Sequence, residues 1–134
     1  MWNEIKNKAD IDYLCDIYDG FHDSCIVNIT YNSTAYVDDE YSMHMSIGNH
    51  FTILKLQRQT PNPKTIELMF ENVLKMNIAV KNEDFCDALS EALLKYENEM
   101  FIWAEYEDYS SDILFSNNKL TWIASKKLKW RIVD

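Results

Sequence analysis

The feature that most constrains this chain is an apolar alternation, with a period of two residues, that runs through its middle. It is present in residues 24–31, 43–47 and 66–70. Because successive side chains of a strand point to opposite faces, each segment predicts a half-buried β-strand. Apolar runs in residues 100–106 and 121–125, and a further alternation in residues 128–132, predict more strands near the C-terminus.

Two turn signals are expected to join neighbouring strands into hairpins. Residues 32–33, Asn and Ser, favour a turn after which residues 35–37 would return as a partner strand. Residues 48–49, Gly and Asn, favour a second turn, because glycine adopts the positive φ that a primed turn requires. That turn is expected to join residues 43–47 to residues 51–57.

Helical periodicity is found on either side of these strands. Residues 10–18 place apolar side chains on one helical face, with Asp10 as the expected N-cap and Gly20 as the expected stop. Residues 83–96 show the same spacing, with Asn82 as the expected cap. We therefore predict an α+β fold: a mostly antiparallel curved sheet of about five to seven strands, with an N-terminal helix and a second helix near 83–96.

Length and composition are those of one ordinary domain. The chain has 134 residues, of which 47% are hydrophobic, and contains no repeat or long linker, so residues 1–134 are expected to form a single domain. No apolar run approaches the roughly 18 residues that span a bilayer, and the first residues do not resemble a signal peptide. We expect a cytoplasmic protein that does not bind membranes, with its three cysteines reduced.

The chain is acidic, and its charge is unevenly distributed. The formal net charge is −9, and four basic residues lie in the last nine positions, which leaves −12 in residues 1–125. Such a body repels phosphate backbones, so nucleic-acid binding is not expected. The acidity either keeps the protein in solution or steers it toward a basic protein partner.

The sequence contains no motif for a cofactor. Glycine occurs only at positions 20 and 48, which excludes glycine-rich nucleotide loops and the nucleophile elbow. No zinc spacing is present, and no catalytic residue, cofactor or metal is assigned.

A possible exception is the pair His22 and Asp23, between the first helix and the first strand. An imidazole beside a carboxylate suits a general base or a metal ligand, although neighbours on an extended chain point apart. The alternative is a structural role, in which His22 makes one hydrogen bond that ties the helix to the sheet. The other two histidines, His44 and His50, are expected on the exposed side of the strand region.

Acidic side chains gather in two clusters that are either solvated loops or contact surfaces for a basic protein. Trp103 precedes the second cluster, so an aromatic ring could lie beside it as an interface anchor, or it could fill the core instead. The candidate binding residues are Asp38, Asp39 and Glu40 in the first cluster, and Glu105, Glu107 and Asp108 with Trp103 in the second.

The segment Phe21-His22-Asp23-Ser24, followed by an alternating strand, carries a family resemblance together with residues 102–104 and 128–131. The pattern resembles a family of small uncharacterised bacterial proteins, some of which are similar to the immunity proteins of polymorphic toxin systems. This resemblance implies a stoichiometric binding role without turnover, and it assigns no ligand or catalytic residue.

Two functional hypotheses follow. The first is a non-enzymatic protein-binding domain of immunity type, which neutralises a basic partner through an acidic and aromatic surface. The alternative is a small metal-assisted hydrolase or ligand-binding enzyme centred on His22 and Asp23. Exposed strand edges would also allow a homodimer.

Overall fold

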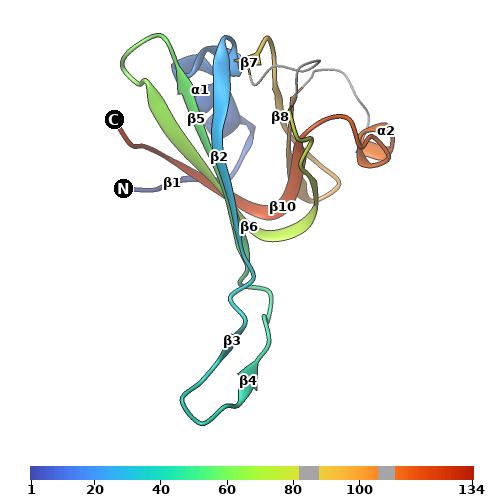
Figure 1. Cartoon of the computed structure of the whole chain (residues 1–134). Coiled ribbons are helices and arrows are strands. Elements are labelled where there is room, and N and C mark those ends of the chain that lie inside the picture. The colour runs from blue at the N-terminus through green and yellow to red at the C-terminus, as the bar shows by residue number, and fades with distance from the viewer. Residues whose placement is uncertain (82–87, 106–110) are drawn as a thin grey trace.

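The main feature of the computed structural model, which describes residues 1–81, 88–105 and 111–134, is a single large antiparallel sheet. Its strands are β1 (Asn3–Ile5), β2 (Ser24–Asn32), β5 (Phe51–Arg58), β6 (Thr65–Asn77), β7 (Ala88–Leu89), β8 (Leu93–Glu97), β9 (Met100–Ala104) and β10 (Trp122–Ile132). They lie in the order β7-β2-β5-β6-β10-β9-β8, with β1 also paired to β10, and the sheet curls into half a barrel (Figure 1). The predicted α+β class and curved antiparallel sheet are confirmed, although the sheet has eight strands rather than five to seven.

The predicted N-terminal helix is present as α1 (Lys8–Ile17). Its N-cap is Asn7 rather than the expected Asp10: the Asn7 side chain accepts a hydrogen bond from the Asp10 amide at 3.0 Å. Asp10 instead lies in the first turn, where its carboxylate accepts the Lys6 amide at 2.8 Å. The two side chains therefore cap the start of the helix together.

After α1, a short 3-10 helix, η1 (Asp19–Phe21), leads the chain into the sheet. Gly20 has a φ of 61° within it, in agreement with its expected role as a stop signal. Phe21 is fully buried and meets Trp103 edge-on, with 6.3 Å between ring centroids. The turn after the helix therefore also contributes an aromatic side chain to the core.

Neither predicted hairpin forms. β2 pairs with β5 over its whole length, from Ser24 opposite Arg58 to Asn32 opposite Phe51. This pairing places Ile26 and Ile29 beside the fully buried Leu56 and Leu54, so apolar burial determines the strand partner and overrides the local turn signals. Residues 35–37 and 43–47 lie between the two strands and leave the main sheet altogether.

The prediction of a helix at 83–96 is wrong for the residues that the structure describes. Residues 88–97 contain β7 and β8, and residues 82–87 lie outside the described part. A turn at Asn98 and Glu99, with φ values of 53° and 63°, joins β8 to β9 as a hairpin. Positive φ at both positions is the geometry of a type I′ turn, which matches the twist of the strands.

The second helix lies nearer the C-terminus, as α2 (Ser111–Phe115), in a stretch that the sequence indicated only as polar. The apolar segments at 121–125 and 128–132 form a single strand, β10, whose register with β6 shifts between Ala124 and Ser125. This shift bends the strand, so that β10 pairs with β9 before it and with β1 after it.

One large core cluster joins α1 to the concave sheet, and a smaller cluster lies beneath α2. The large cluster contains Leu14, Tyr18, Leu54, Leu68 and Trp103, all fully buried. No helix in the described ranges is long and apolar enough to cross a membrane.

Candidate functional site

The most distinctive feature of the molecule is an arm, residues 33–49, that projects beyond the ends of β2 and β5 (Figure 1). It contains β3 (Tyr36–Val37) and β4 (Met43–His44), which pair as a two-stranded sheet separate from the main one. Tyr36 lies opposite His44, and Val37 lies opposite Met43. A two-stranded ribbon without a body to pack on is only marginally stable in water.

Hydrogen bonds close the base of the arm and fix the adjoining start of β5 to β6. The Thr34 hydroxyl donates to the Asn49 side chain at 2.6 Å, and the Asn72 amide donates to the His50 carbonyl at 3.0 Å. The His50 imidazole donates through Nε2 to the Val73 carbonyl at 2.8 Å. His50 is therefore half-buried and ties the start of β5 to β6, whereas the sequence predicted an exposed imidazole.

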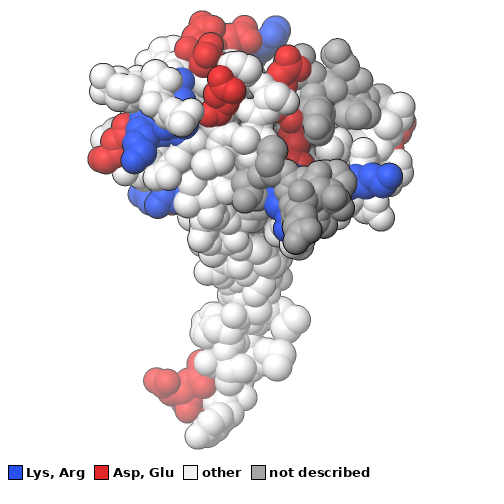
Figure 2. Space-filling view, turned by 45° about the horizontal axis from the view of Figure 1, so that its top comes forward, with Lys and Arg blue, Asp and Glu red and all other residues white. Residues whose placement is uncertain are grey.

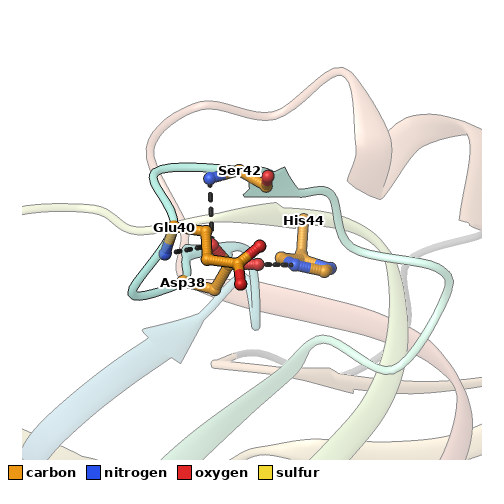
Figure 3. A network of polar contacts seen from close by, with 4 residues as sticks. All are labelled: Asp38, Glu40, Ser42 and His44. Carbon is orange, nitrogen blue, oxygen red and sulfur yellow. Dashed lines mark hydrogen bonds and ion pairs between the residues drawn. The ribbon is translucent and has the colours of Figure 1, made fainter.

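Asp38 organises the tip of the arm (Figure 3). One of its carboxylate oxygens accepts the amides of Glu40 at 2.9 Å and Ser42 at 3.0 Å, and its own amide donates to the Ser42 carbonyl at 3.0 Å. These bonds close the turn between β3 and β4. Asp38 is thus engaged in shaping the arm, with its side chain 34% exposed.

His44 completes this network from the opposite strand. Its Nε2 lies 2.8 Å from the other Asp38 carboxylate oxygen, and its ring stacks on Tyr36 with 4.5 Å between centroids and 6° between planes. The hydrogen bond from His44, followed by that from the Ser42 amide, holds the pKa of Asp38 below its ordinary value. The tip is therefore set by contacts within the arm.

Large apolar side chains on the arm are left in water. Tyr41 is 90% exposed and Ile47 is 88% exposed, values that are rare for such side chains. They belong to a set within twelve residues, namely Tyr36, Val37, Tyr41, Met43, Met45 and Ile47, each more than half exposed. A concentration of this kind marks an interaction surface better than singly scattered apolar residues do.

Two carboxylates remain available at the tip. Asp39 and Glu40 are exposed, and within the described ranges neither forms an ion pair. Figure 2 shows acidic side chains at the far end of an arm and stem that are otherwise free of Lys, Arg, Asp and Glu on that face. The arm thus combines exposed apolar groups with a negative tip.

The two described residues of the second predicted cluster, Trp103 and Glu105, are both buried. Trp103 is fully buried, so it belongs to the core and not to an exposed aromatic patch. Glu105 is only 4% exposed: it accepts the Thr121 amide at 2.8 Å and forms an ion pair with Lys81. Glu107 and Asp108 lie outside the described residues.

His22 and Asp23 do come together, contrary to the expectation that neighbours would point apart. His22 Nε2 lies 3.3 Å from an Asp23 carboxylate oxygen, because Asp23 has a φ of 55° and the chain is not extended there. His22 Nδ1 donates to the Ser90 carbonyl at 2.5 Å, and this bond, with the Asp23 charge second, raises the pKa of His22. The Ser90 bond is of the predicted structural kind, but it joins the start of β2 to the segment after β7.

The His22–Asp23 pair stays isolated among the residues that the structure describes. Both side chains are more than half exposed, and nowhere in those ranges do three His, Cys, Asp or Glu side chains gather so that they could hold a metal ion. A catalytic constellation needs a third group and a shaped cavity. The pair offers a proton-binding site on the surface and no assembled reaction centre.

Sequence reasoning found the acidic tip but missed the apolar part of the arm. The alternation in residues 43–47 is typical of a half-buried strand, but alternation alone does not reveal whether anything covers the apolar face.

Comparisons with known proteins provide no further guide. No family model, no curated protein and no solved structure matches this chain.

Proposed function

We propose that this chain is a non-enzymatic protein-binding domain and that the arm is its docking element. The observation that carries the proposal is the exposure of six large apolar side chains on a ribbon that pairs with no other strand among the described residues. Leaving such surface in water costs about 25 cal/mol per Å², so covering it favours association.

The charge of the arm favours a basic partner. Asp39 and Glu40 lie at the tip without an intramolecular cation among the described residues, and the whole chain carries a net charge of −9. Tyr41 lies beside these carboxylates in the sequence and is almost fully exposed. The complementary surface is an apolar groove rimmed by Lys or Arg, into which the arm inserts.

An immunity-type role, in which the chain neutralises a basic toxin, is the form of this proposal that the family resemblance implies. A cytoplasmic location belongs to the same proposal and is supported by Cys15 and Cys25, which are free thiols. The enzymatic alternative centred on His22 and Asp23 has less support, because the described residues bring no third functional group to the pair.

The test is a pull-down from native lysate with the double variant Tyr41→Ser/Ile47→Ser. Both residues lie outside the strands, so the variant should stay folded. The wild type should retain a basic protein at low salt and release it at high salt, and the variant should not retain it. The matched control is Tyr13→Ser/Val80→Ser, which removes exposed apolar groups from the body and should bind as the wild type does.

Two results would contradict the proposal. One is recovery of no basic protein by the wild type, and the other is equal binding by the wild type and the arm variant. Copurification of a stoichiometric metal that depends on His22 would support the enzymatic alternative instead.

A further inference from the structure

Over most of its length, the outer edge of β2 pairs with no strand among the described residues. β2 pairs with β5 from end to end, but with β7 only at Ser24 and Cys25. Beyond that point, the residues that the structure describes supply no strand on this edge. Natural edge strands are usually protected by charges or proline, and residues 24–37 contain no Asp, Glu, Lys, Arg, His or Pro.

The regular part of this edge is residues 28–32. A bulge interrupts the register with β5 at Val27, and from Asn28 opposite Lys55 onward the pairing is continuous. Within this segment, Ile29 and Tyr31 lie opposite the buried Leu54 and Thr52, which places them on the core side of the sheet.

The remaining three residues of the segment, Asn28, Thr30 and Asn32, alternate with these and lie on the solvent side. The Thr30 hydroxyl donates to the Asn28 side chain at 2.7 Å, which confirms that the two share a face. Both Thr30 and Asn28 are exposed. The edge therefore has one apolar and one polar face, and neither carries a charge.

We propose that residues 28–32 pair antiparallel with the same residues of a second copy of this chain, about a two-fold axis at Thr30. The register sets Thr30 opposite Thr30, Ile29 opposite Tyr31, and Asn28 opposite Asn32. Every cross-strand pair is then chemically compatible. On the core side an aromatic ring meets a β-branched side chain, and on the solvent side hydroxyl meets hydroxyl and amide meets amide. The segment is therefore self-complementary, as an isologous interface requires.

The salt dependence expected for this dimer is opposite to that expected for binding of a basic partner by the arm. Each copy carries a net charge of −9, so two copies repel each other, while the joined edges are neutral. Added salt screens the repulsion and should strengthen the dimer, whereas it should weaken binding of a basic partner. Because the two β2 strands run in opposite directions, the two arms would project from opposite ends and allow bivalent binding.

The experiment is sedimentation equilibrium of the full chain over a range of concentration and salt. The wild type should dimerise, more tightly at higher salt. Thr30→Glu and Thr30→Lys each set like charges face to face and should each weaken the dimer by about tenfold. An equimolar mixture of the two variants should restore association as a heterodimer, because residue 30 of one copy faces residue 30 of the other.

Asn118→Glu is the control, because it adds a charge at an exposed position away from β2 and should leave the dimer unchanged. The double arm variant should also dimerise normally, so that failure of the arm proposal and failure of the edge proposal are separate results. A wild type that stays monomeric at all salt concentrations would overturn the inference. So would a mixture of the charged variants that does not associate better than either variant alone.

Discussion

The carboxylate of Asp38 lies 2.8 Å from Nε2 of His44 and links the two strands of the arm across its tip. The same carboxylate accepts two amides of the turn, so one side chain holds most of the tip in place. The shape of the candidate binding surface therefore depends on the hydrogen bonds of Asp38 within the arm.

We expect Asp38→Ala to loosen the tip without unfolding the body. Amide hydrogen exchange at Glu40 and Ser42 should become several-fold faster, because their acceptor is lost, while amides of β6 should be unaffected. Asp39→Ala is the matched control and should change neither set. Equal exchange in the two variants would show that Asp38 does not organise the turn.

The tip should also open in acid. The pKa of Asp38 is lowered from 3.8, first by His44 and then by the Ser42 amide, so the contribution of its charge is fully present above that value. The contribution is lost as the pH falls through the lowered pKa. Exchange at Glu40 and Ser42 followed below pH 4 should show the loss in the wild type, and Asp38→Ala should show no such step.

His22 should titrate above the ordinary histidine value of 6.5, first because Nδ1 donates to the Ser90 carbonyl and second because Asp23 is adjacent. Because the pKa is raised in the folded chain, protonation of His22 stabilises the fold. This contribution is fully present below pH 6.5 and is lost as the pH rises through the raised pKa. Titration of the ring by NMR measures this. Asp23→Asn should lower the pKa only in part, since the Ser90 bond remains, and a wild-type value at or below 6.5 would contradict the assignment.

Glu105 should prove to be a structural residue. Glu105→Gln keeps an acceptor for the Thr121 amide but leaves the Lys81 ammonium, whose side chain is 19% exposed, without its counter-charge. We expect a loss of about 2 kcal/mol in the free energy of unfolding, below the full cost for a completely buried pair. Urea unfolding measures it, and Lys81→Met/Glu105→Gln should recover part of the loss. If Glu105→Gln left the free energy of unfolding unchanged, the structural role of Glu105 would be contradicted.

The N-cap can be tested in the same way. Asn7→Ala should cost about 1 kcal/mol, because the Asp10 amide loses its acceptor. Asp12→Ala is the control: its contact with Lys8 at 3.2 Å is an exposed ion pair and should contribute much less. If Asn7→Ala were no more destabilising than Asp12→Ala, the cap assignment would be wrong.

The sequence predicted the fold class and the first helix, because both follow from local periodicity. It did not predict strand partners: the turn signals at residues 32–33 and 48–49 favoured neighbouring pairs, while β2 instead pairs with β5, where Ile29 meets the buried Leu54. The spacing in residues 83–96 fitted a helix, yet Leu93–Glu97 becomes a strand because the Asn98 and Glu99 turn returns it onto β9. Pairing between distant segments decided both cases.

For the candidate site, the sequence located the acidic residues 38–40 but not the exposure of their apolar neighbours. Exposure depends on what the rest of the chain covers, and that is known only once the strand partners are known. Trp103 illustrates the same dependence: the sequence left both a surface anchor and a core position open, and the position of β9 between β8 and β10 places the ring in the core.

The position of β10 has a consequence for how the protein is made. This strand follows all the other described strands in the sequence, and it is hydrogen-bonded to β6, β9 and β1. While the chain emerges from the ribosome, β6 and β9 lack their common neighbour, so the two halves of the sheet stay separate until residues 122–132 are available. Assembly of the half-barrel should therefore wait until residues 122–132 have been synthesised, and removal of residues 122–134 should leave a protein that does not fold cooperatively.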